Sequence, residues 1–224
     1  MKRREKPMER EELIERMCGP GLLPVFRTHQ LDHLMAASQA YCEAGISCIE
    51  YTLTMPDALA LVHRAASELS AGCAVGAGTV MDPGTVELAV QAGASFIAGP
   101  GFCPEVVAAC RRLGVVSVVG AVTPTEIMLA LRAGADVIKV FPASAVGPGF
   151  FAEVVGPFPG VRLMAAGGIN LGNVGDYIRA GASVVTVLAN GLATPAYEEG
   201  RMADLQAAAE QLLVTIAAAR RSAV

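Results

Sequence analysis

Lysine is almost absent from this 224-residue chain, in which only Lys2, Lys6 and Lys139 occur. The first two lie in a charged N-terminal leader, so Lys139 is the single lysine of the remaining sequence. It interrupts DVIKVFP at 136–142, a run that otherwise has the composition of a strand buried on both faces. Because lysine is rarely buried without a partner, this position needs a specific reason.

Other scarcities exclude whole classes of function. The six cysteines have no CxxC spacing and the three histidines form no ligand pattern with them, so we expect no metal site and interpret the cysteines as buried small hydrophobes. A net charge of −4 without a basic block argues against a nucleic-acid partner. No apolar run reaches the roughly 18 residues of a membrane span, and the leader lacks the apolar region of a signal peptide. We therefore expect a cytoplasmic protein with no membrane association.

What the chain does contain is one structural unit repeated eight times. Short apolar runs, typical of buried strands, alternate with alanine-rich segments of helical periodicity. The predicted strands are at 22–26, 48–53, 73–80, 95–100, 115–122, 136–142, 161–169 and 183–190. The predicted helices are at 31–44, 56–70, 82–92, 104–112, 124–133, 149–156, 171–180 and 201–219. This series predicts an α/β fold, a (β/α)8 TIM barrel forming one domain over 1–224, in which 1–18 are a charged leader and an N-terminal helix (8–18) that closes the barrel bottom.

In such barrels the catalytic groups lie at the carboxyl ends of the strands. Glu50 interrupts the apolar strand CIEYTL much as Lys139 interrupts its own strand. Strand alternation places Glu50, Thr52 and Thr54 on one face, and Lys139 on the face opposite to Ile138 and Val140. If both faces look into the barrel, one carboxylate and one amine share its mouth.

Two interpretations of this pair are open. It could be a buried structural ion pair, but desolvating two charges costs several kcal/mol per ion, which makes such pairs weak sources of stability. Alternatively, it could form an imine, because a desolvated amine is more readily neutral and can attack a ketone. The protonated imine would act as an electron sink while Glu50 moves protons at the adjacent carbon. The catalytic interpretation is favoured. Arg27, after the first strand, would suit a substrate carboxylate, although it could also be a solvated or helix-capping arginine.

The strand-end segments together resemble a known family. IEYTLTMP, VGAGTV, AGPGF, GAVTPTE, IKVFPAS, VGPGF, GPFPGV and AAGGIN resemble, in order, the motifs of the bacterial 2-keto-3-deoxy-6-phosphogluconate/4-hydroxy-2-oxoglutarate (KDPG/KHG) aldolases. The resemblance spans about residues 20–192. It implies a (β/α)8 barrel, a homotrimer, and metal-free and cofactor-free class I cleavage of a 2-keto acid to pyruvate and an aldehyde.

The resemblance also implies roles for single residues. Lys139 matches the Schiff-base lysine and Glu50 the general acid/base. Thr79 matches a contact of the pyruvyl carboxylate. Pro100 and Phe141 match residues that shape the pocket. Gly167 and Gly168 match the backbone of the loop on the phosphate side of the site. Glycines at strand ends are mostly structural when they occur alone, but here they occur in register with the charged pair.

Two departures from the family pattern affect substrate binding. Some members hold the substrate carboxylate with an arginine at the position where this chain has Thr54. Members with Thr or Asn at that position tend to have an arginine after the first strand, and Arg27 fits this arrangement. After the eighth strand, the usual glycines and serine of the phosphate site are replaced by Leu188, Ala189 and Asn190. Asn190 can donate a hydrogen bond but brings no charge. We therefore expect weak discrimination in favour of phosphorylated aldehydes.

Two alternatives to a pyruvate-releasing aldolase stay open from the sequence. One is a barrel enzyme of another class, such as a sugar-phosphate isomerase or a phosphate-binding synthase, which would not require a buried lysine. The other is a non-catalytic barrel that binds sugar acids. Binding without turnover and without a covalent adduct would favour the latter.

Overall fold

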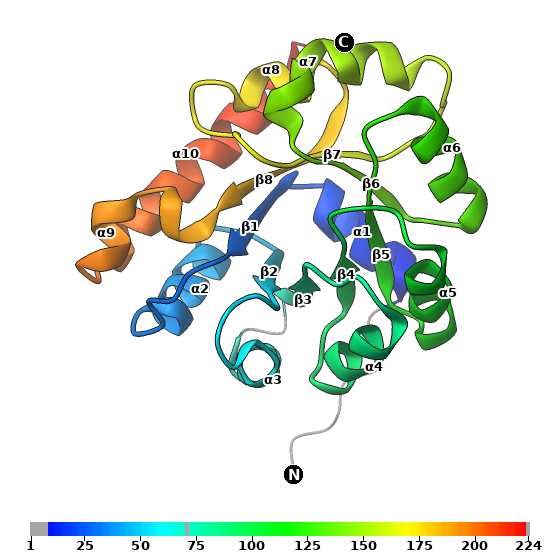
Figure 1. Ribbon diagram of the computed structural model, residues 1–224. Helices are drawn as coiled ribbons and strands as arrows, with labels where there is room; N and C mark the ends of the chain where they lie inside the picture. Colours follow the sequence, from blue (N-terminus) through cyan, green and yellow to red (C-terminus); the bar gives the residue numbers. More distant parts are fainter. Residues whose placement is uncertain (1–8, 70–71, 223–224) are drawn as a thin grey trace.

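The computed structural model describes residues 9–69 and 72–222. Eight parallel strands form a closed barrel in which the strands follow one another in sequence order (Figure 1). They are β1 (Leu22–Phe26), β2 (Cys48–Thr52), β3 (Ala74–Gly78), β4 (Phe96–Ala98), β5 (Val116–Gly120), β6 (Val137–Val140), β7 (Leu163–Ala165) and β8 (Ala182–Leu188). The predicted (β/α)8 barrel is thus confirmed.

Helices precede the barrel, fill each gap between strands and end the chain. They are α1 (Arg10–Cys18), α2 (Leu34–Glu43), α3 (Ala58–Glu68), α4 (Pro83–Gln91), α5 (Pro104–Leu113), α6 (Pro124–Ala133), α7 (Ala143–Val155), α8 (Val174–Arg179), the 3₁₀ turn η1 (Ala189–Gly191), α9 (Thr194–Glu198) and α10 (Met202–Arg221). The charged leader, the first residue of the predicted helix 8–18 and the last residue of the predicted helix 56–70 lie outside the described residues. None of the helices in the described part of the chain is long and apolar enough to cross a membrane.

Local sequence determines where the helices begin and end. In α6, Thr123 accepts a hydrogen bond from the Glu126 N–H and the Glu126 carboxylate accepts one from the Thr123 N–H, which is a complete capping box. Pro124 occupies the first turn, where its missing N–H costs nothing. α4 begins in a similar way, since the Asp82 side chain accepts a hydrogen bond from the Thr85 N–H and Pro83 follows it.

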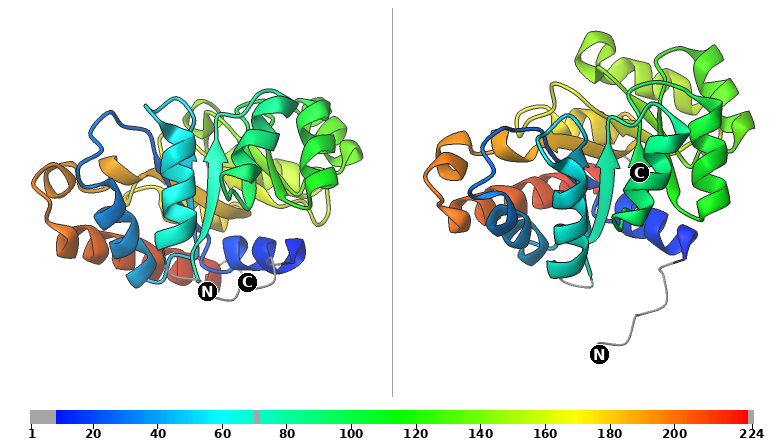
Figure 2. Two further views of the ribbon diagram at one scale, coloured as in Figure 1. Left: turned by 90° about the horizontal axis from the view of Figure 1, so that it is seen from below. Right: turned by 60° about the horizontal axis from the view of Figure 1, so that its bottom comes forward.

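The barrel interior is closed at its lower end by α1. Leu13, Ile14 and Met17 on this helix form one apolar cluster with inward-facing strand residues such as Leu23 and Phe96. Figure 2 shows α1 lying across the end of the barrel from which the strands start. The expected closure by the N-terminal helix is therefore confirmed, and the opposite end is left for a site.

Several predicted elements differ from the observed ones. The strand predicted at 161–169 is the largest overestimate, because β7 covers only Leu163–Ala165. The helix predicted at 149–156 begins earlier, at Ala143, and contains a break at Gly147, where φ is 72° just before Pro148. The strand predicted to reach residue 190 ends at Leu188, since the chain turns into η1. The short helix α9 was not predicted, because the five residues TPAYE are too few to show helical periodicity.

The cysteines behave as small apolar residues. Cys48, Cys73 and Cys110 are buried, the other three are half-buried, and none of the six forms a disulfide within the described residues. Burial raises the pKa of Cys48 and of Cys110 to about 12.

We expect these two thiols to resist alkylation in the folded protein. Because only the thiolate is nucleophilic, a thiol with a pKa of about 12 is almost fully protonated at pH 8. Iodoacetamide should label Cys48 and Cys110 at least about 10²-fold more slowly in the native protein than in denaturant, whereas half-buried Cys103 should react before them. Peptide mass spectrometry over a time course measures the rates. Equal native rates at Cys48 and Cys103 would contradict the burial argument.

Candidate active site

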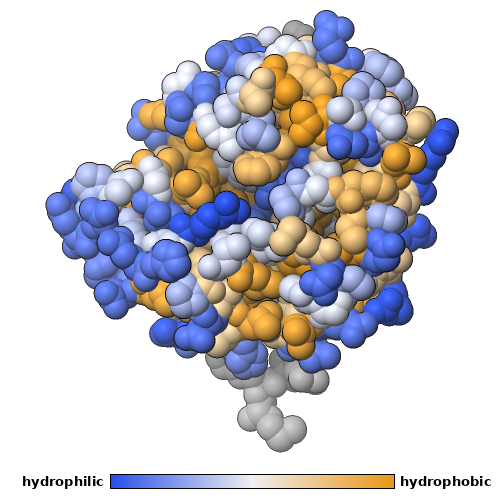
Figure 3. Space-filling model, viewed as in Figure 1, coloured by the Kyte–Doolittle hydropathy of each residue, from blue (hydrophilic) through white to orange (hydrophobic). Residues whose placement is uncertain are grey.

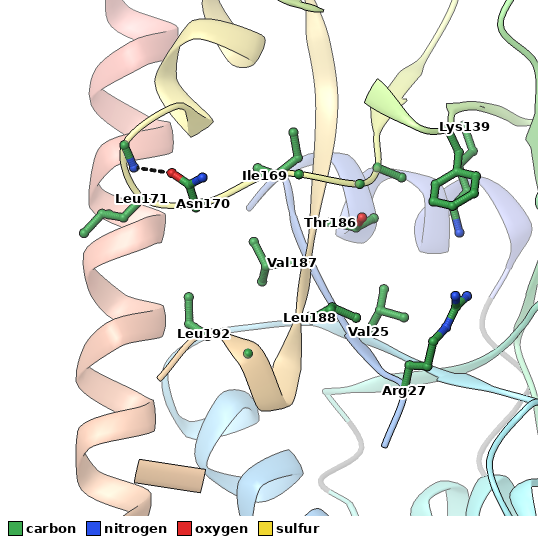
Figure 4. Close-up of a pocket in the computed structure, with 16 residues that line it drawn as sticks. Val25, Arg27, Lys139, Ile169, Asn170, Leu171, Thr186, Val187, Leu188 and Leu192 are labelled. Atoms are coloured by element: carbon green, nitrogen blue, oxygen red, sulfur yellow. Dashed lines mark hydrogen bonds between the residues drawn. The ribbon is translucent and has the colours of Figure 1, made fainter. Parts of the chain in front are cut away.

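A cavity of about 620 Å³ opens at the carboxyl ends of the strands. Figure 4 shows it between the ends of β1, β6, β7 and β8. The lining residues are Val25, Arg27, Lys139, Phe141, Ala166, Gly167, Gly168, Ile169, Asn170, Leu171, Gly172, Thr186, Val187, Leu188, Gly191 and Leu192. This is the end of the barrel where the sequence predicted catalytic groups.

Glu50 and Lys139 meet across the inside of the barrel. Glu50 lies on β2 and Lys139 on β6, and Lys139 Nζ is 3.7 Å from Glu50 Oε2. The two side chains are only 1% and 10% exposed, respectively. Since 3.7 Å is longer than a hydrogen bond, the amine is close to the carboxylate without being held by it. The predicted sharing of the barrel mouth by the two charged groups agrees with this geometry.

The Glu50 carboxylate is unusually poor in partners. Neither of its oxygens has a hydrogen-bond partner among the residues that the structure describes. A buried carboxylate without hydrogen bonds is costly, by several kcal/mol for an uncompensated group. Its oxygens are therefore open to a ligand, and stability does not account for their placement.

Gly78 makes the space that Glu50 occupies. Gly78 ends β3, next to β2 in the barrel, and a Cβ at this position would overlap the Glu50 carboxylate. The glycine in VGAGTV is therefore needed to seat the acidic side chain.

We expect Gly78→Ala to lower kcat by about 10²-fold or more, because a misplacement of about 1 Å is enough to do so. Overpacking should also lower the free energy of unfolding by about 1–3 kcal/mol. Gly149→Ala is the matched control, because a Cβ at Gly149 meets nothing within 4 Å. Steady-state kinetics and thermal melts measure the two effects. Full activity in Gly78→Ala would show that the Glu50 carboxylate tolerates displacement.

Arg27 and Thr79 are joined beside the cavity. The Arg27 guanidinium donates a hydrogen bond of 3.2 Å to Thr79 Oγ1. Thr79 has φ of +63°, a left-handed conformation that is strained for a β-branched residue. Hydrogen bonds from the Leu53 N–H to the Gly78 carbonyl and from the Val80 N–H to the Ala98 carbonyl hold the backbone on both sides. Strain fixed in this way is a common property of ligand sites.

The other predicted pocket residues surround this centre at different distances. Phe141 lines the cavity directly and is 38% exposed. The Pro100 carbonyl packs against Gly120, the residue paired with Lys139 between β5 and β6.

Thr54 lies beyond the end of β2, is exposed, and has its hydroxyl 3.1 Å from that of Thr52. Thr54 and Thr79 line a neighbouring cavity formed by α3, α4 and the loops that precede these helices.

Gly167 and Gly168 line the cavity where the chain leaves β7, and both have positive φ, 89° and 79°. Asn190, in contrast, is not among the lining residues, and its Oδ1 is buried without a hydrogen-bond partner in the described part of the chain. The ends of β7 and β8 are thus brought together as expected, but the Asn190 side chain is not turned toward the cavity.

Sequence reasoning missed several lining residues. Thr186 is a buried polar residue of β8 and faces the cavity (Figure 4). Its polar side chain within the apolar run SVVTVL was a signal of the same kind as Lys139. Ile169, Leu171 and Leu192 gave no such signal. They belong to loops that are brought next to the cavity only when the barrel closes.

The arrangement can bind and activate a small carbonyl compound. A nearly buried amine and an arginine line one cavity, and a carboxylate without hydrogen-bond partners among the described residues lies next to the amine. Within residues 9–69 and 72–222, no group of three or more His, Cys, Asp or Glu side chains is arranged to hold a metal ion. The fold and the site together are those of a lysine-dependent barrel enzyme.

Comparisons with known proteins give the family. The KDPG and KHG aldolase family model matches residues 13–206. The chain is 34% identical over 167 residues to the 2-dehydro-3-deoxy-phosphogluconate aldolase of Pseudomonas aeruginosa, covering 74% of this chain and 76% of the relative. It is 33% identical over 162 residues to the KHG/KDPG aldolase of Escherichia coli K12, covering 71% and 75%.

Solved structures agree. A 4-hydroxy-2-oxoglutarate/KDPG aldolase superposes with a TM-score of 0.81 at 27% identity, over 91% of this chain and 98% of the other. The KDPG aldolase of Legionella pneumophila, solved with pyruvate captured as a covalent carbinolamine, superposes with a TM-score of 0.80 at 25% identity, over 88% and 96%. The chain belongs to the KDPG and KHG aldolase family. It is a class I aldolase, a lyase, and the resemblance found in the sequence is confirmed.

Proposed function

We propose that this cavity cleaves a 2-keto-3-deoxy or 4-hydroxy-2-oxo acid to pyruvate and an aldehyde, with Lys139 as the nucleophile and Glu50 as the proton carrier. The observation that carries the proposal is the 3.7 Å approach of Lys139 Nζ to a buried carboxylate that has no hydrogen-bond partner among the described residues. The carbinolamine captured in the Legionella pneumophila relative supports a covalent route through pyruvate.

The first step is attack of neutral Lys139 Nζ on the C2 ketone. A C–N bond forms, the carbinolamine loses water, and a protonated imine results. Met164, which pairs with Lys139 between β6 and β7, is 0% exposed and belongs to the apolar cluster inside the barrel.

The second step breaks the C3–C4 bond. Glu50 accepts the proton of the C4 hydroxyl, the aldehyde leaves, and the bond electrons pass to the imine to give an enamine. Glu50 then returns the proton to C3, and water hydrolyses the imine to release pyruvate. One carboxylate can serve both proton transfers because neither of its oxygens is engaged by the described residues.

Arg27 is the proposed partner of the substrate carboxylate. Its guanidinium can hold two carboxylate oxygens at once, and its hydrogen bond to Thr79 fixes its direction. Figure 4 shows the ends of Arg27 and Lys139 pointing toward one another, so a 2-keto acid could reach both. Thr54, Pro100 and Phe141 are proposed to shape the pyruvyl end. Gly167 and Gly168 are proposed to line the far end, and Asn190 to support it from the turn η1 without lining the cavity. The homotrimer and the single domain over 1–224 stay predictions.

Borohydride trapping tests the proposal directly. Incubation with pyruvate and borohydride should add one pyruvate-derived mass to the intact protein, on the peptide that contains Lys139. Because Lys2 and Lys6 are the only other lysines, the assignment is almost unambiguous. Matched incubation with borohydride alone is the control. An adduct confined to Lys2 or Lys6, or no adduct, would overturn the proposal.

A further inference from the structure

The half of the cavity away from Lys139 is mainly aliphatic, although Asn170 lies there beside Ile169 and Leu171 (Figure 4). Figure 4 places Lys139 and Arg27 at one side and Ile169, Leu171, Val187 and Leu192 at the other. These aliphatic residues come from the β7–α8 loop, from β8 and from the turn after it. Lys139 and these aliphatic residues line the same cavity, so the part of the substrate beyond C3 can lie against them.

Large apolar side chains are also exposed at the rim of this wall. Leu171 is 43% exposed and Leu188 is 52% exposed. Figure 3 shows apolar surface, in orange, in the hollow over β8 and the β7–α8 loop. Apolar surface beside reacting groups gains from being covered by an apolar ligand.

Charge is missing from the same wall. Lys139 and Arg27 are the only charged side chains that line the cavity, and both are assigned to the pyruvyl half. The remaining polar side chains in the lining are Asn170 and Thr186. A phosphate dianion at the far end would therefore have no positive side chain beside it within the lining.

Two backbone N–H groups of the β7–α8 loop are already engaged in hydrogen bonds within the loop. The Asn170 N–H donates to Asn173 Oδ1 at 2.8 Å, and the Gly172 N–H donates to Asn170 Oδ1 at 2.9 Å. Asn173 Nδ2 in turn donates to the Gly168 carbonyl at 2.9 Å. Two N–H groups that could otherwise bind an anion are thus satisfied by side-chain oxygens within the loop.

We infer that the aldehyde half of the substrate carries an uncharged, apolar substituent, and that Leu188 is a residue that selects it. This inference rests on the function proposed above and specifies the substrate class of the same site. In the synthetic direction, the enamine carbon forms a C–C bond with the aldehyde carbon while Glu50 supplies the proton to the new hydroxyl. The substituent then lies against Leu188, Val187 and Leu192.

A panel of aldehydes condensed with pyruvate tests the inference. We expect kcat/KM to rise about fourfold for each added CH₂ from acetaldehyde to butanal, as each buries apolar surface. Glyceraldehyde 3-phosphate should exceed glyceraldehyde by less than tenfold. A kcat/KM that is independent of chain length, or a preference of about tenfold or more for the phosphorylated aldehyde, would overturn the inference.

Two leucine variants identify the surface responsible. Leu188→Ala should lower kcat/KM for butanal by about tenfold relative to that for glyceraldehyde. Leu129→Ala is the matched control, because Leu129 is 43% exposed on α6 and lies outside the cavity lining; it should leave the ratio unchanged. If Leu188→Ala leaves the ratio unchanged, or if Leu129→Ala lowers it equally, Leu188 does not select the substituent.

Exchange of the pyruvate methyl protons with deuterated solvent separates this inference from the proposed function, since it needs no aldehyde. Dividing each variant's kcat/KM by its own exchange rate corrects for any loss of folded, active protein in that variant. Exchange in the wild type together with a phosphate-preferring panel would overturn the inference and leave the aldolase mechanism standing. Absence of exchange in the wild type would overturn the mechanism, and the inference with it.

Discussion

Lys139→Ala should abolish aldol cleavage, with kcat reduced by about 10⁴-fold or more, since a covalent route cannot proceed without its nucleophile. Borohydride and pyruvate should then add no mass to the protein. Lys139→Arg is the more demanding comparison. It keeps the positive charge beside Glu50 but cannot form an imine, so it should be as inactive as the alanine variant. Cleavage assays and intact mass report both results.

Stability has to be separated from catalysis in this experiment. Removing the amine leaves the Glu50 carboxylate buried without its counter-charge, which should cost about 3–5 kcal/mol of the free energy of unfolding. The double variant Lys139→Ala, Glu50→Gln removes both charges and should recover much of that loss while staying inactive. Aldolase activity in a folded Lys139→Ala protein would contradict the assignment of the nucleophile.

The sequence was most informative where it broke its own pattern. Lys139 and Glu50 could be found because charged residues stand out in apolar strands, and strand alternation then placed them on inward faces. The distance between them could not be predicted in this way, because β2 and β6 are not neighbours in the sheet and their side chains meet only when the barrel closes. The alternation of strands and helices could also be predicted, because each unit shows its own hydrophobic periodicity and its own start and stop signals.

Features that depend on contacts between units were not predictable. The dependence of Glu50 on Gly78 arises from the β2–β3 register, which pairs Thr52 with Gly78. The apolar wall combines Ile169 and Leu192, which are far apart in the chain and carry no local mark of function. The burial of Asn190 Oδ1 follows from the turn η1, which was not predicted because residues 183–190 have the composition of one continuous strand.

Glu50→Gln should separate imine formation from proton transfer. The amide keeps the shape of the carboxylate but cannot accept a proton, so exchange of the pyruvate methyl protons should slow by about 10²–10⁴-fold. Borohydride trapping on Lys139 should persist, because the amine that forms the imine is still present. Nuclear magnetic resonance in deuterated solvent follows the exchange, and mass spectrometry follows the trapping.

The matched control for this variant is Glu153→Gln, which makes the same change at an exposed position on α7. It should leave exchange and trapping at wild-type rates. If Glu50→Gln exchanges protons as fast as the wild type, another group moves the proton, and the open oxygens of Glu50 have a different purpose. If trapping is lost together with exchange while the protein stays folded, Glu50 is required for the imine itself. The opposite pattern, trapping without exchange, is the result that the geometry of the pair predicts, since Lys139 Nζ stands 3.7 Å from the carboxylate and is not fixed by it.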